Sequence, residues 1–176
     1  MLFERFFRPR PSLAAGRALY AQVVEQSRTP RLYAELGAPD TVEGRFELYS
    51  LHLILLLERL RGQGPEARAV SQALFDAYLK GLDDALREMG VGDLSVGKKM
   101  RKLGEAIYGR VKSYEAASGA LPAPGPLRDF IARTVYETGD ASRAADMTLY
   151  AIAQRAALAD WPLERLLEGQ AGWAAP

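Results

Sequence analysis

The segment LYSLHLILLLERL, residues 48–60, indicates the class of fold. From Leu51 to Leu57, every position except His52 is apolar. A helix that is apolar on all sides is normally enclosed by other elements. The run is also far shorter than the roughly 20 apolar residues that a membrane span needs. We therefore expect a central, buried helix around which the rest of the chain packs.

Helical spacing of apolar residues continues on both sides of this segment, and no segment alternates as a strand would. Before the central segment we expect a helix at 12–27, capped by Ser12, and a short helix at 30–36. The central helix should begin with a capping-box-like start at Asp40 and Glu43 and end at Gly62. After it we expect helices at 65–89, 95–117 and 127–137, a helix that runs from a cap at Asp140 to Leu158, and a short helix that begins at Pro162. The sequence thus predicts an all-α fold. We expect a single compact domain of about six to eight helices over residues 12–176, preceded by a tail at 1–11.

The composition narrows the classes of function. The 176 residues carry 23 basic and 22 acidic side chains, so overall charge does not argue for a nucleic-acid partner. The absence of cysteine excludes a disulfide scaffold, a cysteine nucleophile and a thiolate metal site. The single histidine argues against a histidine-based metal site.

Two groups of residues suggest enzymatic sites, and each has a simpler explanation. The pair Asp83–Asp84 is similar to the Asp-rich motifs with which all-α prenyl-transfer enzymes hold magnesium. Adjacent helical residues point about 100° apart, however, and magnesium needs more carboxylates than this pair supplies. His52 could be a general base or a haem ligand, but its nearest carboxylates, Glu47 and Glu58, lie off its face. We expect a solvated helix face and a hydrogen-bonded core histidine, and we assign no catalytic, cofactor-binding or metal-binding residue.

The N-terminal segment MLFERFFRPR, 1–10, alternates large apolar residues with arginines. This mixture suits contact with a membrane interface or a partner, and a short tail without fixed structure explains it equally well. Arginine richness also suits a mitochondrial presequence, although helical patterning resumes almost at once.

A local concentration of positive charge stands out in GVGDLSVGKKMRKLGEAIYGR, residues 90–110, and just beyond it. From Lys98 to Lys112 there are six basic residues and one acidic residue, Glu105, a local charge of +5. Apolar residues recur at helical spacing between them: Met100, Leu103, Ile107, Val111 and Tyr114. Gly104 and Gly109 are unfavourable inside a helix and suggest close packing or close approach by a partner. An ordinary solvated helix face, anionic lipid, RNA and an acidic or membrane-embedded protein partner all remain compatible with this pattern.

The same stretch resembles the characteristic segment of the ubiquinol–cytochrome c chaperone family. That segment has a Gly-Val-x-Asp-Leu stretch, a Lys-Lys-Met helix and a Tyr-Gly-Arg-like triplet. The matching residues are Gly90, Val91, Gly92, Asp93, Leu94, Lys98, Lys99, Met100, Tyr108, Gly109 and Arg110. LHLILLLERL is similar to a second family segment through Leu51, His52, Arg59 and Leu60, with Ile54 where members often carry Trp. IARTVY, 131–136, is similar to an Ala-Arg-Asn stretch, with Thr134 in place of Asn. The resemblance covers roughly residues 12–138.

The resemblance implies a non-enzymatic assembly factor for the respiratory cytochrome bc complex that acts on newly made cytochrome b. It implies cytochrome b or another membrane protein as client. Further partners would be the ribosome, an anionic membrane surface or a small partner protein, and no cofactor is expected. We expect the partner-binding residues to be Lys98, Lys99, Arg101, Lys102, Tyr108 and Arg110. The absence of a long leader suggests a bacterial member located in the cytoplasm, with peripheral binding to the inner membrane left open. A prenyl-transfer-type enzyme and an RNA- or ribosome-binding module are the alternatives.

Overall fold

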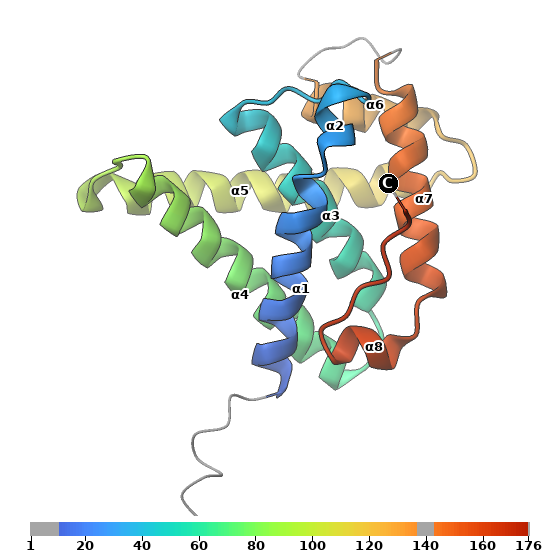
Figure 1. The fold of residues 1–176 in the computed structure, drawn as a ribbon, viewed down its shortest axis with the longest axis horizontal. Helices are drawn as coiled ribbons and strands as arrows, with labels where there is room; N and C mark the ends of the chain where they lie inside the picture. Colours follow the sequence, from blue (N-terminus) through green and yellow to red (C-terminus); the bar gives the residue numbers. More distant parts are fainter. Residues whose placement is uncertain (1–10, 137–142, 176) are drawn as a thin grey trace, which may run out of the picture.

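The computed structural model describes residues 11–136 and 143–175. Within these ranges the chain forms eight helices and no strand, as the sequence predicts (Figure 1). The helices are α1 (Pro11–Ser27), α2 (Pro30–Ala34), α3 (Val42–Leu60), α4 (Pro65–Glu88), α5 (Asp93–Ser118), α6 (Gly125–Thr134), α7 (Ala145–Asp160) and α8 (Leu163–Leu167). Most helix ends agree with the expected ones or differ by one to three residues, and α7 begins at Ala145, four residues after the start that a cap at Asp140 implies. The expected tail, apart from Pro11, and the expected cap Asp140 lie outside the described residues.

Helix α3 is the centre of the molecule, as its apolar sequence predicts. It contacts α1, α4, α5 and α7 (Figure 1). All residues from Leu51 to Leu56, including His52, are buried, and Leu57 is half-buried. The core therefore surrounds α3 on several sides, which explains why its sequence has no polar face.

The start of α3 corrects one expectation. Thr41, not Asp40, is the N-cap residue, because the Thr41 Oγ1 accepts a hydrogen bond of 3.0 Å from the Gly44 backbone N–H. Asp40 instead accepts a 2.6 Å hydrogen bond from Arg45 Nε. A capping box built on Asp40 and Glu43 is therefore wrong, since the cap lies one residue further along the chain. The end of α3 is as expected, with Gly62 at a φ of 73°.

Helices α1 and α4 cross at very short range. A Cβ atom added to Gly16 would lie 2.5 Å from the Cβ of Ala73 and 2.6 Å from the backbone of α4. Only a residue without a side chain allows the two helices to approach so closely. The absence of a side chain at Gly16 therefore permits the close contact between α1 and α4.

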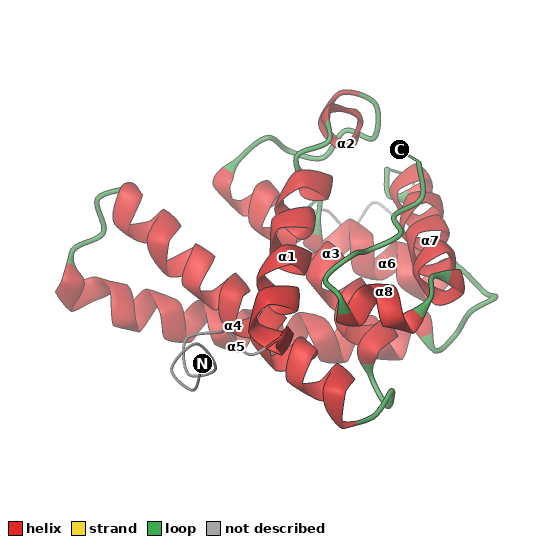
Figure 2. Ribbon diagram, turned by 60° about the horizontal axis from the view of Figure 1, so that its bottom comes forward, coloured by secondary structure: helices red, strands yellow, loops and turns green. Residues whose placement is uncertain are grey.

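The ends of α4 and α5 that meet at the α4–α5 turn form an arm that extends away from α6, α7 and α8 (Figures 1 and 2), while the C-terminal part of α5 packs against α6. Gly90 makes this turn at a φ of 81°. Met89, the last residue of the helix expected at 65–89, instead follows α4 and is 53% exposed. The buried face of α4 ends at Leu86.

The C-terminal segment after α8 packs back on the helical body. The Gln22 side chain donates to the Gly169 carbonyl at 2.6 Å and accepts from the Ala171 N–H at 2.9 Å. The Gln154 side chain makes the same pair of contacts with Ala174. Two glutamines thus anchor this segment to α1 and α7. Across the described ranges, no helix has the length and apolar character needed to cross a membrane.

Candidate interaction site on helix α5

Helix α5 is anchored to the body through one apolar face. Val96, Ile107 and Tyr114 on this face are buried, and Leu103 and Val111 are half-buried. The helix packs against α3, α4 and α6. The apolar spacing read from the sequence therefore gives the buried face correctly, and the charged residues are left on the outside.

The four clustered cations of α5 are all exposed, as the sequence predicts. Lys98, Lys99 and Lys102 form no ion pair with any described residue, and Arg101 lies 3.9 Å from the exposed carboxylate of Glu105. Screened pairs of this kind hold a side chain only weakly. The cluster is therefore available to an external anion.

Tyr108 and Arg110, the other two expected partner-binding residues, lie in different environments. Tyr108 is 75% exposed. Arg110 forms a bidentate ion pair with Glu47 of α3, at 2.9 Å through Nε and 2.7 Å through Nη2. The hydrogen bonds to Glu47 raise the pKa of the Arg110 guanidinium above its ordinary value. Arg110 therefore ties α5 to α3, and its place among the partner-binding residues stays a prediction that this pair argues against.

The two glycines of α5 do not serve packing within the described chain. A Cβ atom added to Gly104 or Gly109 would meet nothing within 4 Å. Close packing against another helix of the described chain is therefore wrong as their explanation. Close approach by a partner remains a prediction for both positions.

His52 is the hydrogen-bonded core histidine that the sequence predicts. Its Nδ1 lies 2.8 Å from the Leu48 carbonyl and 3.1 Å from the Ser27 hydroxyl. Its Nε2 lies 2.7 Å from the Tyr150 hydroxyl, which also accepts a 2.9 Å hydrogen bond from Gln26. Nδ1 donating to the carbonyl and Nε2 accepting from Tyr150 satisfies a neutral ring. Burial lowers the pKa of His52 to about 4, and the Leu48 carbonyl acts against this shift.

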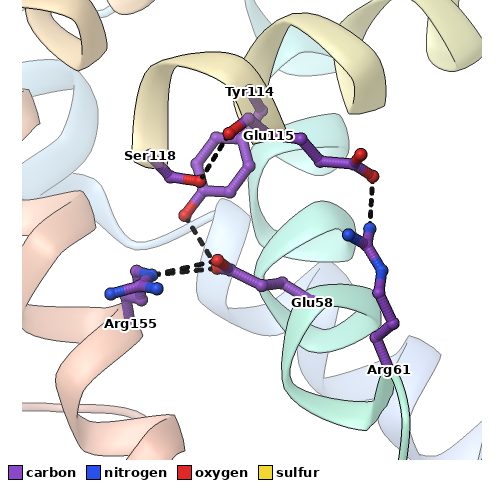
Figure 3. A network of polar contacts seen from close by, with 6 residues as sticks. All are labelled: Glu58, Arg61, Tyr114, Glu115, Ser118 and Arg155. Carbon is purple, nitrogen blue, oxygen red and sulfur yellow. Dashed lines mark hydrogen bonds and ion pairs between the residues drawn. The ribbon is translucent and has the colours of Figure 1, made fainter. Parts of the chain in front are cut away.

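A second polar network attaches the C-terminal half of α5 to the end of α3 (Figure 3). The Tyr114 hydroxyl donates to Glu58 of α3 at 3.1 Å, and Arg155 of α7 donates to both oxygens of the same carboxylate at 3.1 Å. Arg61 pairs with Glu115 beside it. Burial, followed by the Glu58 charge, raises the pKa of Tyr114. Glu58 therefore joins three helices, α3, α5 and α7. No sequence pattern indicated this network, whose role is to hold the fold together.

Two clefts in the described part of the chain have no residue of α5 in their lining. One, of about 430 Å³, is lined by Leu55, Glu58, Arg59, Gln63, Arg155 and Ala159. Another, of about 500 Å³, lies between α2 and α7 and is lined by Arg31, Glu35, Leu36, Asp146, Leu149, Tyr150, Ala153, Gln154 and Ala175. In the first cleft, Glu58 is engaged with Arg155, and Arg59 donates to the backbone carbonyls of Leu158 and Trp161.

Asp83 and Asp84 are engaged along their own helix. Asp83 pairs with Arg87, and Asp84 pairs with Lys80, each at 2.7 Å. In the described part of the chain, no three His, Asp or Glu side chains are grouped as a metal site would require. The two aspartates thus lie on a solvated helix face, as expected.

Leu94 is the exposed residue that sequence reasoning missed as a functional candidate. It lies in the first turn of α5 and is fully exposed. The available signal was its spacing, because Leu94 precedes Lys98 by four residues and Arg101 by seven. Residues at these spacings share one face of a helix.

Comparisons with known proteins agree on one family. The model of the family described as "Ubiquinol-cytochrome C chaperone" matches residues 34–173, which include the whole of α5. The crystal structure of the Cbp3 homolog from Brucella abortus is similar to this chain with a TM-score of 0.86 and 32% sequence identity, over 99% of this chain and 97% of that one. No curated protein gives a significant match. The family match covers well over half of the chain, and the chain therefore belongs to the ubiquinol–cytochrome c chaperone family.

Proposed function

We propose that this protein is a non-enzymatic assembly chaperone that binds newly made cytochrome b and supports assembly of the respiratory cytochrome bc complex. The observation that carries the proposal is the family match over residues 34–173. The similarity to the Brucella abortus Cbp3 homolog along nearly the full chain supports it. Binding at the inner membrane surface, where a membrane-protein client is inserted, is part of the proposal.

The proposed docking surface consists of Lys98, Lys99, Arg101, Lys102 and Tyr108. Its partner is acidic or anionic, because the four cations are exposed and only Arg101 lies near a described carboxylate. Charges of this kind accelerate and orient association even where they add little to the stability of a fold. Arg110 contributes indirectly by holding α5 against Glu47.

A prenyl-transfer-type enzyme is not favoured by any observation. Its main sequence support was Asp83–Asp84, whose carboxylates are paired with Arg87 and Lys80 on the same helix. An RNA- or ribosome-binding module would use the same cations as the proposed docking surface. The two functions differ in the molecule that is bound. The proposed chaperone binds a membrane protein, whereas the alternative binds RNA.

The test of the function uses cells of the source organism that lack the gene. These cells are expected to lose the absorbance of assembled cytochrome bc complex while their other respiratory enzymes persist. The parent chain should restore the complex, and a variant with Lys98, Lys99, Arg101 and Lys102 all replaced by Glu should not.

A charge-matched control replaces Arg17, Arg68, Arg128 and Arg133 by Glu. These four residues are exposed on α1, α4 and α6. The control variant should restore the complex. Normal complex levels in cells without the gene would overturn the proposed function, and full rescue by the α5 variant would overturn the docking surface.

A further inference from the structure

One face of α5 combines exposed apolar and basic side chains. Its members follow one another at intervals of three or four residues, which places them on the same side of a helix. They are Leu94, Lys98, Arg101, Glu105, Tyr108 and Lys112, and all six are exposed. The buried residues Val96, Ile107 and Tyr114 lie on the opposite side, which packs against the body.

Two members of this face, Leu94 and Tyr108, are large apolar residues. Six large hydrophobic residues are exposed among the described residues, and three of them, Met89, Leu94 and Tyr108, lie in α5 or in the turn that joins it to α4. Leu94 is fully exposed and Tyr108 is 75% exposed. At 1.5 Å per residue, the two lie about 21 Å apart along α5. Met89 and Leu94 lie on either side of the α4–α5 turn, which projects away from α6, α7 and α8 (Figures 1 and 2).

The charges around these residues are mainly positive. Lys98, Arg101, Lys102 and Lys112 are exposed on this side of α5, and Glu105 beside Arg101 is the one acidic member of the face. At the α4–α5 turn, Asp83 and Asp93 share Arg87 as their ion-pair partner, and the exposed Glu88 pairs with no described residue. A face with spaced cations and a few protruding apolar side chains fits a flat anionic surface, and neither cleft described above is lined by a residue of α5.

We propose that this face of α5 lies on an anionic lipid bilayer, with Leu94 and Tyr108 inserted among the headgroups and the basic side chains bound to lipid phosphates. Basic side chains near a membrane surface are attracted to anionic lipid, and tyrosine is enriched at the interface. The inference rests on the proposed function, because the face shares Lys98, Arg101 and Tyr108 with the proposed docking surface and takes lipid as its anionic partner. A membrane-bound arm would hold the body of the chaperone beside the bilayer into which its client inserts.

Vesicle flotation tests the lipid contact with the purified full chain. Vesicles contain either phosphatidylcholine alone or two parts of it with one part of phosphatidylglycerol. The chain should float with the anionic vesicles only. Leu94→Gln should lower the affinity roughly tenfold, and the double change Lys98→Gln, Lys102→Gln roughly twentyfold. The matched controls are Leu149→Gln, at a 63% exposed leucine of α7, and the double change Arg128→Gln, Arg133→Gln on α6, and both should bind like the parent.

Insertion is tested separately, because the chain has no cysteine and a single one can be labelled. Leu94→Cys carrying an environment-sensitive dye should show a blue shift and a several-fold rise in emission with anionic vesicles. Leu149→Cys with the same dye should show neither. Unchanged emission at position 94 would overturn the proposal, as would equal changes at both positions or equal binding to neutral vesicles.

The outcomes separate this inference from the proposed function. If the chain ignores anionic vesicles but captures cytochrome b in detergent, the lipid contact is wrong and the chaperone function stands. Binding to ribosomal RNA that needs Lys98 and Lys102 but tolerates Leu94→Gln, without vesicle binding, would also overturn the lipid contact. If vesicles bind as expected but cells without the gene assemble the complex normally, the proposed function fails while the lipid-binding face remains.

Discussion

His52 shows how enclosure sets the charge state of a residue. The ring is fully buried and its partners suit the neutral form, so its pKa falls from 6.5 to about 4. The unfolded chain therefore binds more protons than the folded chain between these values. The stability that the neutral ring contributes is complete above about pH 6.5 and is lost as the pH falls toward about 4.

The free energy of unfolding should accordingly fall on acidification by up to about 3 kcal/mol from His52 alone. His52→Gln removes the titrating group, so this variant should be less stable at neutral pH and show a flatter pH profile than the parent. Urea unfolding at several pH values between about 7 and 4.5 measures both profiles. Parallel profiles for the two proteins would show that folding does not lower the pKa of His52.

The Glu47–Arg110 pair gives a second prediction for single residues. Glu47→Gln replaces a half-buried, bidentate ion pair by a neutral contact and should cost about 1–3 kcal/mol of unfolding free energy. Glu105→Gln is the control, because its pair with Arg101 is exposed and long, and it should cost less than about 0.5 kcal/mol. Urea unfolding of both variants measures the difference, and equal costs would mean that Arg110 is free for other partners.

Two helical glycines, Gly16 and Gly104, have the same intrinsic helix propensity, but replacement by alanine should change the free energy of unfolding in opposite directions. Gly16→Ala places a methyl group against Ala73 and should separate α1 from α4, at a cost of roughly 1–3 kcal/mol. Gly104→Ala meets open space inside a helix and should stabilise the protein by about 1 kcal/mol. Thermal melting of both variants gives the two signs. A stabilising Gly16→Ala would show that the two helices do not cross as described.

The central helix itself was predictable, and the contacts around it were not. Burial of Leu51–Leu56 follows from an apolar sequence without a polar face, and exposure of Lys98–Lys102 follows from helical spacing. Which oxygen caps α3 depends on whether the backbone turns at Asp40 or Thr41, and both residues are good caps. The Arg110–Glu47 pair and the Glu58 network join helices whose relative placement no local pattern encodes. Sequence alone also could not separate Gly16, which is enclosed, from Gly104, which is open.

For the molecule as a whole, the basic surface should be separable from the fold. Replacing Lys98, Lys99, Arg101 and Lys102 by Glu should leave the helical signal intact and change stability little, because exposed pairs contribute about 0–1 kcal/mol. Vesicle binding by the parent should weaken steeply as salt rises, since exposed charges are screened. Circular dichroism and flotation at increasing salt measure these two properties. Unfolding of the variant, or salt-independent binding by the parent, would contradict a surface that works through exposed charge.

We propose that this chain binds newly made cytochrome b. A pulse-labelling experiment tests this binding: newly made proteins receive a short radioactive pulse in source cells that carry the tagged chain, and the chain is then purified in mild detergent. Labelled cytochrome b should be recovered with the parent chain and with the Arg17, Arg68, Arg128, Arg133 control, and it should drop to background with the charge-reversed α5 variant. Other labelled membrane proteins serve as the internal reference. Recovery of cytochrome b no greater than that of these other proteins with the parent chain would contradict the claim.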